Sequence, residues 1–594
     1  MFAGRGVVFS LLVVGVLAVF AGAVLAAGLS AAPERNPALP LVGTPVQVEF
    51  STYLPFAINT TLASGVLSGK VVDSTGVVSG ATVRVQATTN ATVTGVDGRF
   101  ILAGLAPNQP VVLTAWALGY FIGGGERYLP GADSVELVLE THAAEDNPDY
   151  EWLSAFADAG DENNCQNCHA DPDDSNSSLP FDEWQRDAHA SSTKNQRFLT
   201  MYAGTDINGN QSPLTEYFCD QDYGCVPLPP DLSQPYYGPG YKLDFPDTAG
   251  NCAACHAPAA AVNTPYDVDP TSVSGVGSEG AACDYCHKIW DVKLDARTGL
   301  PFENMPGVLS FELRRPPEGH QFFAGPFDDV APGEDTYSAL QTQSQICAPC
   351  HFGAFWGIQV YNSFGEWLES PYNDPDQGQT CQDCHMPPTG ATHFTLPDKG
   401  GIERNPDEIF SHRMLGAMDE SLLGNAVTMT VTASLVGDEV LVQVDITNDL
   451  TGHHVPTDSP LRHLILLVQA TDTTGNKLAY SAGPVVPEWG GQGDPAGGYY
   501  AGLPGKAYAK VLQELWTYTM PTGAYWNQTR VVSDNRLAAF ETDTSTYTFT
   551  APQGGDITIK VTLLFRRAFI ELMDQKGWQV PDIVMEGETL VLKR

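Results

Sequence analysis

Cys165-Gln-Asn-Cys168-His169 is the first of five stretches with the same spacing, and these stretches decide the fold of the chain. The other four are Cys252-Ala-Ala-Cys255-His256, Cys283-Asp-Tyr-Cys286-His287, Cys347-Ala-Pro-Cys350-His351 and Cys381-Gln-Asp-Cys384-His385. The chain has 12 cysteines and 13 histidines in 594 residues. Chance would produce about 0.005 such units in a chain of this composition. The repeated spacing therefore indicates one chemical requirement that is met five times.

The Cys-x-x-Cys-His spacing is the attachment site of c-type haem. Two thiols separated by two residues can bond the two vinyl groups of one porphyrin, and the next histidine then faces the iron. Zinc has no reason to require a histidine directly after every cysteine pair. The sequence therefore predicts five covalently attached haem c groups, each bound through both cysteines of its motif. The predicted proximal ligands are His169, His256, His287, His351 and His385.

Thirteen histidines less the five in the motifs leave eight, enough for a second imidazole on every iron. Iron with two histidine ligands is six-coordinate and suits electron transfer better than substrate binding. Sequence context favours His320, His393 and His412 as distal ligands. We expect His142, among acidic residues, at the surface, and His463, at the head of an apolar strand, in a core.

Cys219 and Cys225 lie outside the motifs, close together in a turn-rich stretch. In an exported protein they predict a local disulfide, and two free thiols are the alternative. The segment from Asp206 to Asn210 is similar to part of a calcium loop, although it lacks the glycine at the sixth position. A Ca²⁺ site here is a further expectation.

The net charge is −40, from 30 basic and 70 acidic residues. Nucleic-acid binding requires a basic face, so nucleic acid is excluded as a first hypothesis for the partner. The charge favours redox partner proteins with basic docking patches. The oligomeric state is left open.

Residues 1–27 read as a signal peptide or an uncleaved N-terminal membrane anchor, and residues 28–64 as a linker. Both interpretations predict that the chain is exported, to the periplasm or to the cell surface. Residues 65–141 and 421–594 show short apolar runs between Gly, Asn and Asp turns, which predict β-sandwiches. The predicted fold is therefore mixed and multidomain, with an irregular, partly helical multihaem domain at 142–420 between two sandwiches. The two short gaps between motifs predict two closely packed haem pairs, 252 with 283 and 347 with 381.

Two resemblances add to this reading. The pattern of Gly69, Val71, Asp73, Gly80-Ala81-Thr82-Val83 and Asp97-Gly98-Arg99-Phe100 resembles the carboxypeptidase regulatory-like family. This family implies a transthyretin-like sandwich that serves as an accessory module.

The five motifs and their surrounding phrases resemble multihaem c-type cytochromes of the cytochrome c554-like group over residues 150–594. The matching phrases are Trp184-x4-His189-Ala190, Thr380 to Pro387, His412-Arg413 and Gly452-His453-His454-Val455-Pro456-Thr457. The resemblance implies that His189 is a distal ligand, and that a C-terminal β-domain donates His453 or the adjacent His454.

The first functional hypothesis is an exported pentahaem cytochrome that relays electrons, which makes an electron-transfer protein a better reading than an enzyme. A multihaem oxidoreductase of nitrogen or sulfur compounds would need one open iron lined by Arg, Lys or Tyr. A subunit of an extracellular cytochrome filament would need a ligand or haem contact across an interface. No side chain is assigned a catalytic role.

Overall fold

The computed structural model describes residues 65–157, 164–222, 224–331 and 333–594. The predicted signal peptide or anchor and the predicted linker lie outside these residues. Within the described ranges, every helix is too short or too polar to cross a bilayer.

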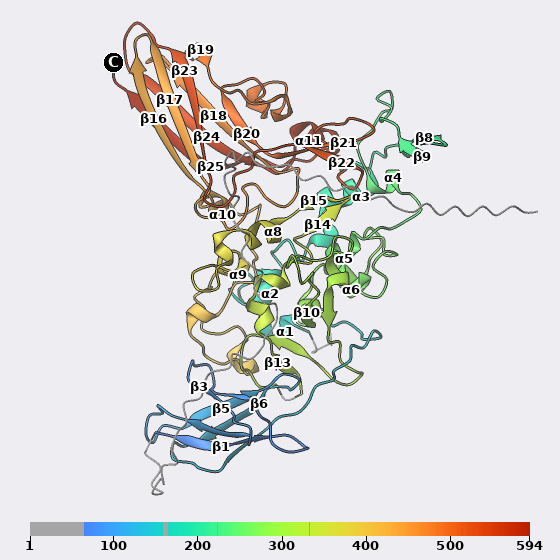
Figure 1. Ribbon diagram of the computed structural model, residues 1–594, viewed down its shortest axis with the longest axis vertical. Coiled ribbons are helices and arrows are strands. Elements are labelled where there is room, and N and C mark those ends of the chain that lie inside the picture. The colour runs from blue at the N-terminus through green and yellow to red at the C-terminus, as the bar shows by residue number, and fades with distance from the viewer. Residues whose placement is uncertain (1–64, 158–163, 223, 332) are drawn as a thin grey trace, which may run out of the picture. The chain divides into compact units, whose positions relative to one another are not determined.

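The N-terminal part is built from two small sheets (Figure 1). One is mixed, with the strand order β4-β1-β7, and the other is antiparallel, with the strand order β3-β2-β5-β6. The strands are β1 (Leu67–Val72), β2 (Thr82–Val85), β3 (Ala91–Val93), β4 (Arg99–Leu102), β5 (Val111–Trp116), β6 (Gly123–Tyr128) and β7 (Val135–Val138). Leu67 and Val71 alternate with more exposed residues along β1 and are fully buried. They meet Phe100 and Leu102 of β4 and Leu113 of β5 in one core. The period-two alternation in the sequence thus gives each sheet one apolar face, and the two faces form a sandwich.

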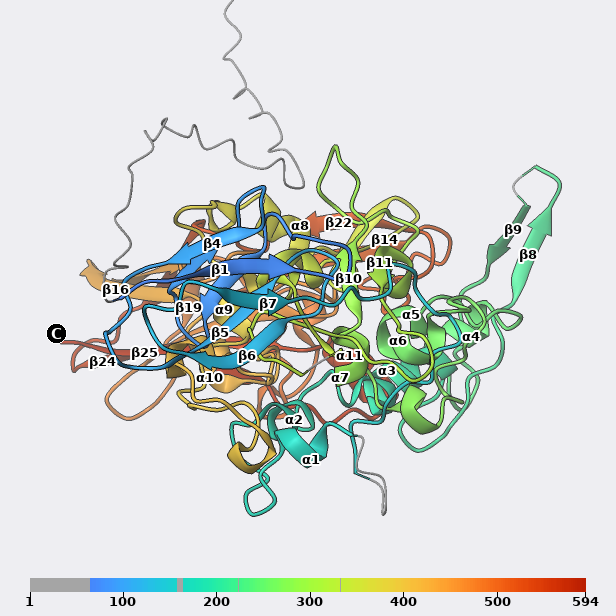
Figure 2. The same cartoon turned by 90° about the horizontal axis from the view of Figure 1, so that it is seen from below.

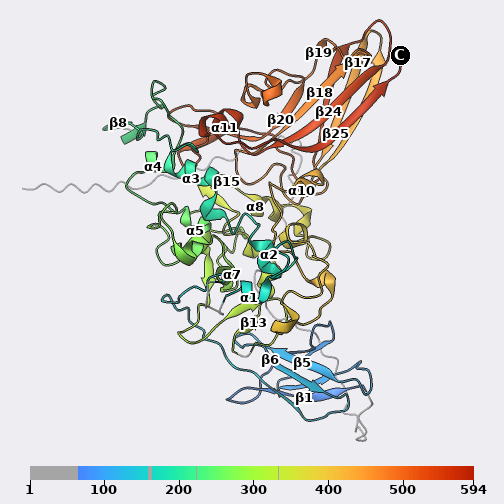
Figure 3. The same ribbon diagram turned by 180° about the vertical axis from the view of Figure 1, so that it is seen from behind.

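The C-terminal part repeats this architecture with longer strands, in the sheet orders β16-β17-β23-β19 and β20-β18-β24-β25 (Figure 3). The main strands are β16 (Thr428–Val436), β17 (Glu439–Thr447), β18 (His463–Thr471), β19 (Tyr480–Ala482), β20 (Gly505–Tyr508), β23 (Thr542–Thr550), β24 (Ile557–Arg566) and β25 (Ile583–Leu592). Val440, Val442, Val444 and Ile446 of β17 are all fully buried in the core. A separate ribbon, β21 (Lys510–Glu514) with β22 (Thr529–Asp534), and the helix α11 (Ile570–Lys576) complete this region.

The middle of the chain consists of short helices, short two-stranded ribbons and long connections (Figure 2). Its helices are α1 (Gln166–His169), α2 (Pro180–Trp184), α3 (Gln196–Ala203), α4 (Tyr241–Asp244), α5 (Ala253–His256), α6 (Pro258–Ala261), α7 (Cys283–Cys286), α8 (Ser363–Leu368), α9 (Cys381–His385) and α10 (Glu420–Gly424). Its strands are β8 (Tyr217–Asp220), β9 (Gly224–Pro227), β10 (Ile289–Val292), β11 (Phe311–Leu313), β12 (Phe323–Gly325), β13 (Asp335–Tyr337), β14 (Gly353–Phe355) and β15 (Ile358–Tyr361). The buried apolar residues form several small clusters here, in contrast to the large core of each sandwich.

His142, expected at the surface, is instead buried between the N-terminal sandwich and the middle region. Its ring centre lies 5.0 Å from that of Phe322 and 5.2 Å from that of Trp290. The expectation was wrong because the acidic neighbours of His142 in sequence do not surround it in space. His463, expected in a core, is fully buried and stacks on Phe569.

A buried ion pair fastens the N-terminal sandwich to the middle region. Asp328 accepts hydrogen bonds from Thr114 of β5 at 2.9 Å and from Arg404 at 3.0 Å. The side chains of Asp328 and Arg404 are 0% and 1% exposed. Arg404 also binds Asp329 at 2.7 Å and lies over the ring of Phe327. Because both charges are removed from water, each is stabilised by the opposite charge, and the loss of one partner leaves the other at a high cost in free energy.

We expect Asp328→Ala to lower the free energy of unfolding by about 3–5 kcal/mol, because it leaves a buried guanidinium with less compensation. Urea denaturation measures this loss. The exposed Asp398→Ala is the matched control and should change stability by less than about 0.5 kcal/mol. Equal stability of the two variants would show that the ion pair does not stabilise the contact between the N-terminal sandwich and the middle region.

Candidate functional site

Each of the five motifs is wound into a single helical turn. The backbone N–H of the motif histidine donates to the carbonyl of the first cysteine at 3.0–3.1 Å in the motifs that start at Cys165, Cys252, Cys283 and Cys347. The fifth motif forms α9, whose start is closed by a capping box between Thr380 and Asp383. Residues three and four apart share one face of a helical turn. The spacing therefore aims both thiols and the imidazole of each motif in one direction.

All five motifs point into one cavity of about 2370 Å³. Every motif cysteine and every motif histidine lines it. The ten motif cysteines are half-buried, and none of them is joined in a disulfide. A pocket for one drug-sized ligand measures about 300–1,000 Å³, so this cavity has room for several large groups. The repeated donor set fits a porphyrin at each motif.

Hydrogen bonds orient three of the motif imidazoles. Nδ1 of His169 donates to the carbonyl of Phe394 at 2.8 Å, and Nδ1 of His287 donates to the carbonyl of Ala324 at 2.8 Å. Nδ1 of His385 donates to the carbonyl of Leu415 at 2.5 Å. In each case Nε2 keeps its lone pair, which is the arrangement found in metal-binding histidines. Burial also lowers the pKa of these three imidazoles, which favours the neutral form that binds metals.

Two motif imidazoles face a second imidazole across the cavity. The ring centres of His351 and His189 are 6.3 Å apart, and those of His385 and His453 are 6.1 Å apart. A metal–imidazole bond is about 2 Å long and the ring centre lies roughly 1 Å further on, so two imidazoles on opposite sides of one metal have centres about 6 Å apart. Both pairs have the separation that a six-coordinate iron requires.

The structure distinguishes His453 from His454. Nδ1 of His453 donates to the carbonyl of His454. Nε2 of His453 is therefore the nitrogen that can bind a metal on the side of His385. His454 lies beside the carboxylate of Glu366 in α8, with its Nδ1 3.1 Å from Oε1. Glu366 also receives Arg536 at 2.7 Å and Thr457 at 2.5 Å. This buried carboxylate holds the whole His453–Thr457 loop against α8.

The remaining distal candidates occupy different places. His412 lines the cavity close to both His169 and His287, and burial lowers its pKa to about 4. His320 is exposed and His393 is half-exposed with a hydrogen bond to Thr392, and neither is among the residues that line the cavity. The ring of His256 is covered by Phe198, stacked at 3.7 Å. The sequence did not single out Phe198.

The motif cysteines lie close together in pairs. Cys283 lies beside Cys165, Cys350 beside Cys255, and Cys347 beside Cys381. Each contact, together with burial, raises the pKa of the first-named thiol. The predicted pairing of the motifs at 347 and 381 agrees with these contacts.

The motifs at 252 and 283, which were predicted to pair, share one apolar cluster that contains Ala253, Ala254, Tyr285 and Cys286. Cys283 is next to Cys165 because Ala282 packs with Phe181 and Trp184 of α2, whose indole N–H donates to the carbonyl of Ala281 at 2.9 Å. This tertiary contact gives motif 283 a second neighbour that the sequence gaps did not indicate. The motif at 252 also meets the motif at 347, because Cys350 packs on the same cluster and lies beside Cys255.

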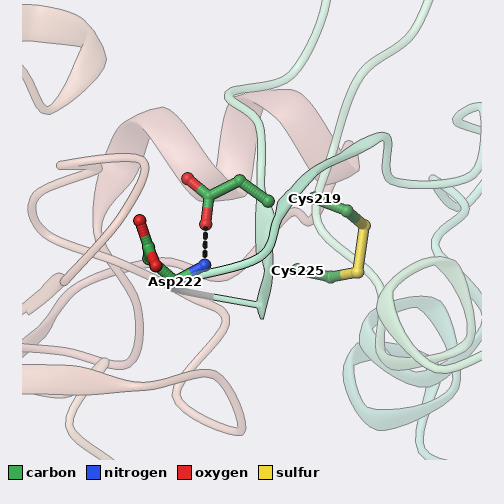
Figure 4. Close-up of a disulfide and its surroundings, with 4 residues drawn as sticks. Cys219, Asp222 and Cys225 are labelled. Carbon is green, nitrogen blue, oxygen red and sulfur yellow. Dashed lines mark hydrogen bonds between the residues drawn. A yellow bond between two sulfur atoms is a disulfide. The ribbon is translucent and has the colours of Figure 1, made fainter.

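Cys219 and Cys225 are joined by a disulfide across the hairpin of β8 and β9 (Figure 4). The proposed calcium loop closes as a hydrogen-bonded turn, because the Asp206 carboxylate accepts from the backbone N–H groups of Asn208 and Asn210 and from the Asn210 amide. Across the part of the chain that the structure describes, no group of three or more His, Cys, Asp or Glu side chains is arranged to hold a metal ion by itself.

Comparison with known proteins identifies one module of the chain. Residues 66–121 match the family model of the carboxypeptidase regulatory-like domain. This match confirms the resemblance predicted for the N-terminal sandwich. No curated protein matches the chain.

Two solved structures are similar to parts of the chain. One is a penta-haem cytochrome c552 from Thermochromatium tepidum, with 17% sequence identity and a TM-score of 0.48, over 72% of this chain and 97% of that chain. The other is the ASH/PapD-like domain 7 of human CEP192, with 9% identity and a TM-score of 0.11, over 30% of this chain and 87% of that chain.

We expect Glu366→Gln to loosen the His453–Thr457 loop and to reduce the loss of stability in acid. Burial raises the pKa of Glu366, but His454 and Arg536 outweigh it and lower the pKa to about 2. The carboxylate therefore stabilises the fold above its ordinary pKa of 4.5, and this contribution of about 3 kcal/mol is lost as the pH falls from about 5 to 2.

Urea unfolding at pH 7 and at pH 3 measures this effect. The variant should be less stable than the wild type at pH 7 and should lose less between the two pH values. Glu369→Gln, an exposed position three residues further on, should match the wild type at both. A wild-type acid dependence in Glu366→Gln would contradict the assignment.

Proposed function

We propose that the chain is an exported pentahaem c-type cytochrome that relays electrons to or from redox partners in the periplasm or at the cell surface. Each motif would hold one haem c through its two cysteines, with its histidine as proximal ligand. When bound, these groups supply one-electron redox chemistry between the ferric and ferrous states. The protein's part is to fix their spacing, ligands and electrostatic surroundings.

One observation carries the proposal: five identical Cys-x-x-Cys-His turns, far apart in sequence, converge on a single cavity. Imidazoles face each other at 6.3 and 6.1 Å for two motifs, and this supports six-coordinate iron there. His189 and His453 are the proposed distal ligands of these two. His412 is the proposed distal ligand at His169 or His287, the two imidazoles it lies near.

The thiol contacts support an order for the relay. Motif 165 meets motif 283, and motif 347 meets motif 381. Cys286 and Cys350 pack on the same apolar cluster, which brings motif 283 next to motif 347. The proposed main path is therefore 165–283–347–381. Motif 252 branches from its middle, next to motif 283 through the shared cluster and next to motif 347 through the contact of Cys255 with Cys350.

The net charge of −40 supports partners that present basic patches. The disulfide of Cys219 and Cys225 supports an oxidising compartment, since such bonds persist outside the cytoplasm. The N-terminal and C-terminal sandwiches carry no attachment motif. The C-terminal sandwich nevertheless contributes His453 to the cavity.

The test is a pyridine haemochrome count combined with an EPR spectrum of the oxidised protein. Five haems per chain are expected, with low-spin signals from the motifs at His351 and His385 and from one of the motifs at His169 and His287. A count below five would overturn the pentahaem assignment. A high-spin signal that integrates to three or more irons would overturn at least one of the three proposed bis-histidine pairs.

Removing the attachment cysteines of motif 347 should interrupt the relay at its centre. We expect Cys347→Ala with Cys350→Ala to lower the count from five to four. Reduction by a partner should then be biphasic, because motif 381 is separated from motifs 165 and 283. The same change at motif 252 is the control, since a branch can be lost without dividing the main path. Single-phase reduction in the first variant would contradict the order.

The distal assignments can be separated by substitution. We expect His189→Ala and His453→Ala each to convert one iron from low-spin to high-spin and to open it to cyanide, measured by EPR and absorbance. His320→Ala and His393→Ala should leave the spectra unchanged, because neither histidine is among the residues that line the cavity. A high-spin signal in either control would restore that histidine as a ligand.

A further inference from the structure

Two arginines stand opposite each other at the end of the β18–β24 pair. Arg462 precedes β18 and Arg567 follows β24, and both line the cavity. His463 pairs with Arg566 in the antiparallel register, so the next positions outward, Arg462 and Arg567, face one another. Like charges directly opposite on neighbouring strands destabilise a sheet.

A third arginine reaches the same place from α3. Met201 of α3 packs in one cluster with Leu461, Ala568 and Phe569, which are the chain neighbours of the other two arginines. Arg197, one turn earlier on α3, also lines the cavity. The next residue, Phe198, is the ring stacked on His256. The three arginines thus meet beside the motif that branches from the relay.

The protein compensates little of this positive charge. Arg462 donates to the carbonyl of Thr457 at 3.3 Å and lies 3.4 Å from Asp458, the one carboxylate near it in the described part of the chain, which also lies 4.0 Å from Nδ1 of His351. Nε of Arg567 is buried and, within the described residues, has no hydrogen-bond partner. Burial, then Arg567 and Arg462, lower the pKa of Arg197 to about 10. Three arginines gathered in a protein with only 30 basic residues against 70 acidic ones indicate that an anion belongs among them.

We propose that Arg197, Arg462 and Arg567 form an anion site on the cavity wall beside His256, which takes a carboxylate or a small oxyanion. The proposal rests on the proposed function, because one source of the anion is haem c, which carries two propionate carboxylates. The same chemistry has two sources: a propionate of the haem at motif 252, or a free oxyanion that enters the cavity. The planar guanidinium forks bind either group through paired hydrogen bonds.

The site has a defined electrostatic effect. A fixed positive charge close to a haem favours the ferrous form, which carries one positive charge fewer. The arginines therefore oppose the lowering of potential that the overall charge of −40 produces. Loss of an arginine should lower the midpoint potential at motif 252 and leave distant motifs unchanged.

The experiment compares the loaded wild type with Arg197→Gln, Arg567→Gln and the double variant, and uses the exposed Arg127→Gln as control. Haem content is measured first by pyridine haemochrome. Spectroelectrochemical titration then gives the midpoint potentials. Absorbance titration of the ferric protein with sodium nitrite, and separately with sodium sulfite, reports a free oxyanion. Arg567→Lys keeps the charge without the fork and should recover most of the midpoint.

Three results are distinguishable. A saturable response to nitrite or sulfite in the wild type, weakened at least tenfold in the glutamine variants, supports the site with a free oxyanion. No such response, together with one lowered midpoint in the variants, supports it with a propionate. Midpoints and anion responses equal to those of the wild type and Arg127→Gln, with five haems retained, overturn it. A wild-type count below five is a separate result, and it overturns the proposed function. If the glutamine variants do not fold, Arg197→Lys and Arg567→Lys provide the comparison through what the paired guanidinium hydrogen bonds supply. A weakened anion response or a shifted midpoint at motif 252 then supports the site, and wild-type values of both overturn it.

Discussion

The middle of this chain is organised by a geometric constraint on a five-residue turn. Two thiols and an imidazole can serve one planar group only if they leave the backbone on the same side, and one turn of helix achieves this. Because five such turns face one cavity, the chain between the sandwiches does not collect its apolar side chains into one large core. The short helices, the two-stranded ribbons and the long connections are all consistent with a fold that depends on groups bound in the cavity for its interior.

The two sandwiches show which strands the hydrophobic periodicity of the sequence can predict and which it cannot. The strands now seen as β1, β5, β16, β17, β18 and β24 were predictable, because each has an alternating or continuous apolar run between turn residues. β6 carries no such signal because its sequence begins with three glycines, and the signal of β25 is interrupted by Glu586, Gly587 and Glu588. Both strands are defined by their neighbours, β5 and β24, rather than by their own residues.

The residues of the cavity likewise divide into those that the sequence could predict and those that it could not. The fifteen motif residues were identifiable from spacing, since that spacing is itself the chemistry. Which histidine faces which motif was not, because the decisive contacts are tertiary: Glu366 fixes the loop that presents His453, and Ala282 packs on α2 to bring Cys283 to Cys165. The arginines at 197, 462 and 567 gave no signal in the sequence, since they are up to 370 residues apart and meet only through α3 and the end of a sheet.

The position of His453 has a consequence for how the molecule is made. An exported chain emerges from its N-terminus, so motif 381 reaches the outer compartment before the loop that carries its opposing imidazole. That loop is fixed through Glu366, Arg536 and the sandwich strands around it. Under the proposed function, the last centre of the relay is completed only when the C-terminal sandwich has folded. Maturation of the whole electron path is therefore coupled to synthesis of the complete chain, and a truncated product would be recognisable by one unfinished centre.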